Sequence, residues 1–392
     1  MFKLVLFELK KTFISWPILA AIIMCSLLNI YKIFEFYNSN SDFAGDHASE
    51  MKTAFWDLHE QYSGKITQTK INEIISSYAD MENDYLNHTF EYEYDKEKFL
   101  TGYFSTDYVL YKRDFYNEMK RMAEYTYYCE DLIFSAKENV KFYEKCDNDF
   151  EMKKNQIIIN TFENRGVTTF YRTEGWECYF KYDFSSLMIV CLLIMCVPTV
   201  FTYENEIKMT PLLETFAYGR SNNYISKLIS VFVETFLTLL IFTVIDLISF
   251  NACFILTNPC VPVYSIESFA NTPFDISILT SVVIDFIFKL IGFYNIALLM
   301  IFISLLSSNS IISYVIGLIS VMVQVFLYVY TNFSPLQLVL GRGILKQFDV
   351  INVCSLAVPF HLLLPLIYLT INILFDFSIY FLARIRGRSC EI

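Results

Sequence analysis

Apolar runs of about 20 residues, separated by short polar stretches, fill the second half of the chain and recur near its start. A helix needs about 20 apolar residues to cross the hydrocarbon core of a bilayer, so each run predicts a spanning helix. A β-barrel would instead show short segments in which apolar and polar residues alternate. The six predicted spans are Phe13–Tyr31, Leu187–Phe201 with its flanks, Ile225–Phe254, Ile276–Leu306 (long enough to kink near Gly292), Ile311–Tyr330 and Val353–Leu382.

The predicted fold class is an all-α polytopic membrane protein with six transmembrane helices and a mostly helical extracytoplasmic domain between the first and second. Composition agrees, because 55% of the residues are hydrophobic and only 18% are charged, whereas soluble proteins are about 25% charged. The predicted divisions are 1–12, a cytoplasmic interface helix (or a plain basic leader); 13–34, the first transmembrane helix; 35–182, the extracytoplasmic domain; and 183–392, five transmembrane helices with a cytoplasmic loop at 202–224.

The segment 35–182 has the polar composition of a folded domain outside the bilayer. Helices are expected at 51–62 and 68–82, with Gly64 as the break between them and Thr67 as the N-cap of the second. The clearest helix covers about 106–145, and a long amphipathic helix needs a partner, so a helical hairpin or small bundle extending from the membrane is expected. Its apolar stripe is Phe115, Met119, Met122, Thr126, Cys129 and Ile133.

Basic residues fix the expected orientation, since loops rich in Lys and Arg stay in the cytoplasm. Lys3, Lys10, Lys11, Lys208, Arg220, Lys227, Arg384, Arg386 and Arg388 fall on one predicted side. The short loops on the other side, 258–274 and 331–352, contribute only Arg342 and Lys346. The sequence therefore predicts a multi-pass protein of the cell membrane with both termini in the cytoplasm.

The acidic balance is confined to one part of the chain. The formal net charge is -11, and residues 35–182 hold 28 of the 41 acidic residues and 17 of the 30 basic ones. Nucleic acid is excluded as a partner, because phosphates require a basic face. A cationic ligand for the acidic domain is one interpretation, and simple solvation of a surface is the other.

Motifs of self-contained catalysis are absent from the sequence. It contains no GxxxxGK[ST] phosphate-binding loop, no HExxH and no GxSxG. No two of the ten cysteines have CxxC spacing, so no metal site is expected. The chain is therefore predicted not to be an enzyme and to hold no cofactor. Pairing among the cysteines expected outside the bilayer stays open; these are Cys129, Cys146, Cys178 and Cys260.

Asp246, Asp285, Lys289 and Asp376 are ionisable residues within the apolar spans, where such residues are costly. Asp285 and Lys289 are four residues apart on the fourth span and can pair on one helix face. Asp246 lies in the third span and Asp376 in the sixth. A polar track or gate is one interpretation, and structural pairing is the other. An intramembrane enzyme would need these carboxylates clustered at one depth.

The polar stretch between the second and third spans carries a distinctive pattern. In chain order it holds Glu204, Glu206, Leu212, Leu213, Thr215, Gly219, Arg220 and Lys227. This order resembles the cytoplasmic loop of the permease subunits of type 2 ATP-binding cassette (ABC) transporters, especially those of Gram-positive bacteria. Ile207 to Met209 depart from that loop, which usually has a glycine there. The layout of interface helix, six spans and enlarged first extracytoplasmic segment is also similar.

The resemblance implies a function that the chain cannot perform alone. It implies the membrane-spanning half of an exporter for a hydrophobic or amphipathic substrate, such as a lipid, a peptide or an antimicrobial compound. The implied partners are a separate ABC ATPase subunit, which would hold ATP and magnesium, and a second permease chain in a homo- or heterodimer. The patterned residues would couple the two proteins. A non-transporting membrane sensor or scaffold with a ligand-binding ectodomain is the alternative.

Overall fold

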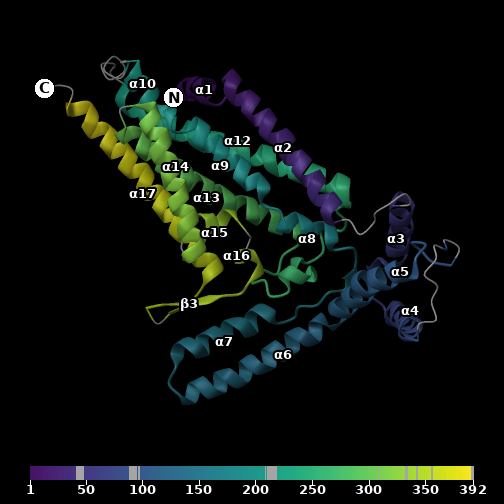
Figure 1. The fold of residues 1–392 in the computed structure, drawn as a ribbon. Helices are drawn as coiled ribbons and strands as arrows, with labels where there is room; N and C mark the ends of the chain where they lie inside the picture. Colours follow the sequence, from purple (N-terminus) through teal and green to yellow (C-terminus); the bar gives the residue numbers. More distant parts are fainter. Residues whose placement is uncertain are drawn as a thin grey trace.

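The computed structural model describes residues 1–40, 48–87, 95, 98–207, 209, 219–307, 309–331, 334–340, 343–354 and 356–389. Within these ranges, six helical segments are long and apolar enough to cross a membrane, so the polytopic all-α fold is confirmed. Figure 1 shows them running through one bundle, with both chain ends at the same end of it. We call this the termini end, and the opposite end, next to the domain inserted between the first two spans, the domain end.

The spans themselves follow the predicted apolar runs. The first spanning helix continues to Asn40, several residues past the predicted boundary at 34. The elements are α2 (Trp16–Asn40), the consecutive helices α8 (Glu174–Lys181), α9 (Phe184–Cys196) and α10 (Thr199–Glu206), then α12 (Gly219–Phe254), α13 (Ile278–Leu306), α14 (Ser310–Tyr330) and α17 (Phe360–Ser389). A short helix, α1 (Phe2–Thr12), precedes them.

A break at Pro198 divides the second span near the termini end. Proline lacks a backbone N–H, which interrupts the helical hydrogen-bond ladder. Serines of neighbouring helices satisfy the groups that this break leaves: Ser304 Oγ donates to the Pro198 carbonyl at 2.7 Å and accepts from the Phe201 N–H at 3.2 Å. Ser313 Oγ donates to the same carbonyl at 3.1 Å. The break is therefore a junction where α9, α10, α13 and α14 are joined.

The sixth span begins later than the sequence predicts. Val353 was expected as its first residue, but it ends a strand, β3 (Val350–Val353), which pairs antiparallel with β4 (Leu356–Pro359). The helix starts at Phe360, directly after Pro359. Apolar β-branched residues suit a strand as well as a buried helix, so the length of the run could not distinguish them.

The fourth span is one continuous helix through Gly292, without a break there. Gly292 instead permits close packing of the chain between the fifth and sixth spans. A Cβ at position 292 would lie 2.7 Å from Val339 Cγ2 and 2.9 Å from the Pro335 carbonyl oxygen. The short helix α15 (Leu336–Val339) is buried against the middle of α13, although this segment was predicted as part of an external loop.

The inserted domain is helical, as predicted. Gly64 adopts a positive φ of 98° between the first two helices, and Thr67 caps the second by accepting from the Lys70 N–H at 3.4 Å. The elements are α3 (Ala48–Tyr62), β1 (Gly64–Lys65), α4 (Gln68–Leu86), α5 (Phe104–Leu110), the π-helix η1 (Tyr111–Asn117), α6 (Glu118–Lys145), α7 (Asp149–Phe162) and β2 (Thr169–Phe170), which pairs with β1.

The predicted long helix is present as α5, η1 and α6 in one run. The predicted stripe is correct at Phe115, Met119, Met122 and Cys129, which are buried. It is wrong at Thr126, which is exposed. Tyr125 is buried instead, and it donates to the Ala270 carbonyl at 2.8 Å.

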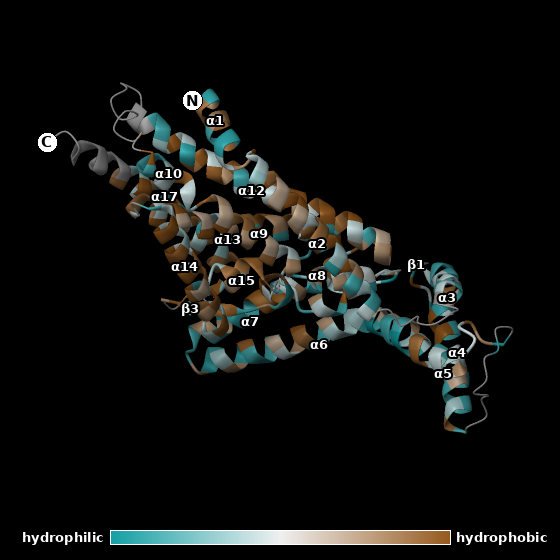
Figure 2. Ribbon diagram, turned by 45° about the horizontal axis from the view of Figure 1, so that its top comes forward, coloured by the Kyte–Doolittle hydropathy of each residue, from teal (hydrophilic) through white to brown (hydrophobic). Residues whose placement is uncertain are grey.

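Helices α6 and α7 form the expected hairpin, but it lies across the bundle's domain end instead of projecting from it (Figure 1). Arg121 donates to the Ser265 carbonyl at 2.5 Å, and Arg165 to the Thr272 carbonyl at 2.7 Å. The rings of Phe162 and Phe348 pack edge to face. Figure 2 shows apolar residues concentrated in the bundle and polar ones over the inserted domain.

Candidate functional site

The termini end of the bundle contains a buried group of four charged side chains, which we call the charge cluster. Lys227 Nζ donates to Glu204 Oε1 at 2.7 Å and to Glu8 Oε2 at 3.2 Å. Its third hydrogen bond goes to the Val200 carbonyl at 2.8 Å. Lys11 Nζ donates to the same Glu204 oxygen at 3.0 Å. The cluster therefore joins α1, α10 and α12.

The cluster forms because the face of α1 that packs against the bundle carries an acidic residue, Glu8, among apolar ones. Val5, Leu9 and Glu8 are buried on one side of this helix, whereas Phe7 is exposed on the other. Such an arrangement suits a helix lying in the membrane interface, with exposed aromatic rings toward lipid. Phe2–Thr12 is thus helical, as one of the two interpretations expected, and Glu8 on its buried face contacts Lys227 of α12.

Complete pairing makes this burial tolerable. Lys227 has no solvent exposure, and all three donors of its ammonium group are in use. Two lysines and two glutamates give the cluster no formal net charge. A buried ion pair is held strongly only when every member is satisfied, and removing one partner costs about 3–5 kcal/mol. The three helices are thereby held in one arrangement.

The other acid of the sequence pattern has a different intramolecular partner. Glu206 Oε1 accepts from the Ser310 N–H at 2.7 Å, which caps the start of α14. Gly219 and Arg220 belong to the first turn of α12, where only the backbone is described. Leu212, Leu213 and Thr215 lie outside the described residues. The structure thus brings Glu204 and Lys227 together and places Glu206 on the neighbouring helix junction.

A polar group at the domain end contains Asp246. Asn29 Nδ2 donates to Asp246 Oδ1 at 2.6 Å, and the Tyr182 hydroxyl donates to Asn29 Oδ1 at 2.8 Å. Asn29 has no solvent exposure and Asp246 is buried. These contacts join α2, α12 and the turn between α8 and α9.

The remaining predicted intramembrane residues pair within or beside α13. Lys289 Nζ lies 3.1 Å from Asp285 Oδ2, so the pairing predicted from their spacing is present. Tyr294 donates to Asp376 Oδ1 at 2.9 Å, which links α13 to α17. The three carboxylates of Asp246, Asp285 and Asp376 thus have different partners. Among the described residues, no three His, Cys, Asp or Glu side chains assemble into a possible metal site.

Sequence reasoning missed three buried polar features of the bundle: an acid in α1, a pair of asparagines and an acid in α12. Glu8 follows no motif, but it shares a helix face with Val5 and Leu9, and this spacing could have marked it as buried. Asn295 donates to Asn372 at 2.8 Å between α13 and α17. Glu234 lies in the apolar run of the third span and is 1% exposed. A carboxylate in such a run is itself a signal, as it was for Asp246.

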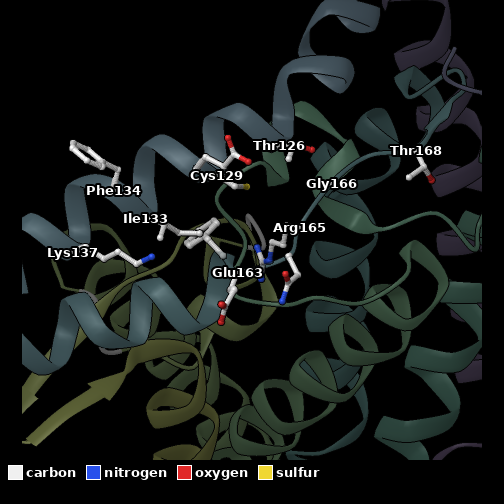
Figure 3. A pocket seen from close by; sticks show the side chains of 12 residues that line it. Thr126, Cys129, Ile133, Phe134, Lys137, Glu163, Arg165, Gly166 and Thr168 are labelled. Atoms are coloured by element: carbon white, nitrogen blue, oxygen red, sulfur yellow. The ribbon is translucent and has the colours of Figure 1, made fainter. Parts of the chain in front are cut away.

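A cavity of about 710 Å³ opens in the inserted domain, between α6 and the turn that follows α7. Figure 3 shows Lys137 reaching from α6 toward this turn, while Phe134 points away from it. Arg165 lies at its base, 4.7 Å from the Phe162 ring, and is 3% exposed. Acidic, basic and apolar side chains all line the cavity, so charge alone selects no ligand class.

The thiols outside the bundle core are unpaired. Cys129, Cys146, Cys178 and Cys260 are free, as is every other cysteine within the described ranges. Burial raises the pKa of Cys129, which is the opposite of the shift that activates a thiol. Cys129 is therefore not an activated thiol on these grounds.

Comparison with known proteins gives no further guide to function: no family model, no curated protein and no solved structure matches the chain.

Proposed function

We propose that the chain is the membrane-spanning subunit of an ABC-type exporter whose power comes from a separate ATPase. The observation that carries the proposal is the charge cluster, because Glu204 and Lys227 flank the polar stretch that links α10 to α12. A force applied to that stretch would act on both helices. Glu8 extends the same connection to α1.

The sequence supports an external source of energy. It contains no phosphate-binding loop, and its polar stretch has the order of acids, leucines and Gly-Arg that resembles a permease coupling loop. The partner would contact the stretch between α10 and α12 and the adjoining Arg220 at the start of α12. Because Glu204 and Glu206 already have intramolecular partners, their proposed part in coupling is to transmit movement and not to bind the ATPase.

The proposed cycle follows from this connection. Closure of the ATPase on ATP would push the stretch, the cluster would carry the movement into α1 and α12, and a cavity shared by two permease chains would change its access. The excess of basic residues at the termini end supports a cytoplasmic location for both ends. The substrate class is hydrophobic or amphipathic, and the membrane is the cell membrane.

Co-purification tests the proposal. The full tagged chain, extracted from its native membrane, should carry an ATPase subunit with it. The Arg220→Glu variant reverses a charge next to the stretch, so the ATPase should no longer co-purify with it. Arg113→Glu is the matched control, because Arg113 is on the inserted domain beside Asp114 and should leave the ATPase bound.

The alternative is a sensor or scaffold that transports nothing. The cavity between α6 and the turn after α7 favours it, since its volume suits a small ligand. If the unaltered chain isolates without an ATPase, and Arg220→Glu leaves its set of partners unchanged, the exporter proposal is wrong. If the unaltered chain retains an ATPase and the Arg220→Glu variant loses it, the scaffold alternative is wrong.

A further inference from the structure

Glu234 differs from the other carboxylates of the bundle that were described above. Both of its carboxyl oxygens are buried, and neither has a hydrogen-bond partner among the described residues. Asp246, Asp285 and Asp376 each have one. Within the spanning segment Asn222–Phe254, Glu234 is closer to the termini end.

None of the described side chains beside Glu234 carries a positive charge that is free to pair with it. The Thr12 hydroxyl and the Cys196 thiol lie beside the carboxyl group, but Thr12 donates to the Glu8 carbonyl at 3.0 Å instead. Lys227 is two helical turns away on the same face of α12, and its three donors are occupied. Among the residues that the structure describes around Glu234, no basic group is therefore left to neutralise its ionised form.

The elements packed around this part of α12 carry few ionisable groups. Each acidic or basic group among them already takes part in an ion pair or a hydrogen bond. The ionisable groups that face this part of α12 are Glu8 and Lys11 on α1, Cys25 on α2, Cys196 on α9, Tyr294 on α13 and Asp376 on α17.

We propose that Glu234 is a proton-binding site that links the packing of the bundle's termini half to pH. Moving an unpaired carboxylate from water into a medium of low dielectric is strongly unfavourable, so the packed arrangement holds the neutral acid. Ionisation requires water, and water reaches Glu234 only when α1 and α9 separate from α12. One proton is therefore released when this end opens and bound when it closes.

The proposal stands whether or not the chain is an exporter, because it concerns only the chain's own packing. It makes the closed arrangement favoured at low pH and weakened as pH rises. Glutamine has nearly the shape of the protonated acid and cannot ionise, so Glu234→Gln should keep the closed packing at every pH. Glu234→Met, with an apolar side chain of similar length, serves as a second neutral variant.

The test is the melting temperature of the full purified chain in lipid nanodiscs, from about pH 5 to about pH 9. At the acid end, wild type and Glu234→Gln should melt together. With rising pH, the wild type should fall below the variant by about 2 °C or more per pH unit. Asp246→Asn, which removes a partnered carboxylate from the same helix, should retain the wild-type slope.

Infrared spectroscopy gives a second reading that does not depend on stability. The wild type at low pH should show the carbonyl-stretch band of a buried carboxylic acid that Glu234→Gln lacks. Parallel melting curves for wild type and Glu234→Gln would overturn the proposal, as would failure of both neutral variants to fold. Stabilisation of the wild type alone by sodium at high pH would also overturn it, in favour of a metal-cation site.

Discussion

Lys227 illustrates how a single side chain can organise several helices. Its ammonium group is fully buried and contacts two acids from two other elements. Lys227→Met should destabilise the protein by about 3–5 kcal/mol, because Glu204 and Glu8 would be left with Lys11 alone. The measurement is thermal unfolding of the purified chain in detergent.

A double-mutant cycle separates the pair from the rest of the cluster. Glu204→Gln combined with Lys227→Met should cost less than the sum of the two single changes. Lys32→Met is the control, because Lys32 forms an exposed pair with Glu35 and should change stability by less than about 1 kcal/mol. Strict additivity of Glu204→Gln and Lys227→Met would contradict the coupling.

His59 should make the inserted domain sensitive to acid. Its ring packs against the rings of Phe115 and Phe170, with centroids 4.9 Å and 5.1 Å away. Burial, with the nearby charge of Arg172, lowers its pKa from 6.5 to about 3. Between these values the unfolded chain binds more protons, so stability is complete above about pH 6.5 and falls by up to about 1.4 kcal/mol per unit as pH drops.

The measurement for His59 is a difference between two pH profiles. Unfolding of the inserted domain within the full chain is followed from about pH 7 to about pH 4, for the wild type and for His59→Phe. Groups that titrate in both proteins cancel, and the variant should lose less stability on acidification. Equal losses in the two proteins would show that His59 is not the group responsible.

Individual residues were predictable where local spacing decided their contacts. Asp285 and Lys289 pair because they are four apart on one helix. Glu204 and Lys227 were identified through their pattern, but the pairing of Lys227 with Glu8 joins residues 219 positions apart. No local rule gives that contact, since it depends on how α1 lies against α12.

At the scale of the elements, the packing of α15 against α13 depends on the absence of a side chain at Gly292. Gly292→Ala would place a methyl group 2.7 Å from Val339 Cγ2 and 2.9 Å from a backbone oxygen, closer than atoms pack. Alanine favours a helix by about 1 kcal/mol over glycine, but overpacking costs about 1–3 kcal/mol. The expected net result is a lower melting temperature and greater solvent access to Leu338.

Gly317→Ala is a matched control on the next spanning helix. Its added Cβ would meet only Pro198 Cγ, at an ordinary 3.8 Å. The variant should therefore be as stable as the wild type or slightly more stable. Equal effects of the changes at 292 and 317 would mean that α15 does not press against α13 as described.

Element types followed from the sequence better than their ends did. Six apolar runs gave six spans, and the long amphipathic run gave a hairpin. The β3–β4 strand pair and the π-turn η1 were missed, because both replace a helix without changing the apolar composition. Tertiary packing selects such departures, so hydrophobic periodicity alone does not reveal them.

On the scale of the whole molecule, Arg165 fastens the inserted domain to the spans. Besides the Thr272 carbonyl, it donates to the Pro273 carbonyl at 3.2 Å, in the loop leading into α13. Arg165→Ala should raise hydrogen exchange in α7 and that loop by about tenfold or more, since two charge-assisted bonds are lost. Arg113→Ala, which removes a more exposed cation, should leave exchange there unchanged.

The neutral balance of the charge cluster carries a consequence for sequence divergence. A lone substitution at position 227 leaves an uncompensated charge inside the bundle, whereas paired substitutions need not. Positions 8, 11, 204 and 227 should therefore covary in any related chain, with loss of the lysine at 227 accompanied by loss of an acid at 8 or 204. Four separated positions changing together would identify distant relatives that overall similarity does not detect.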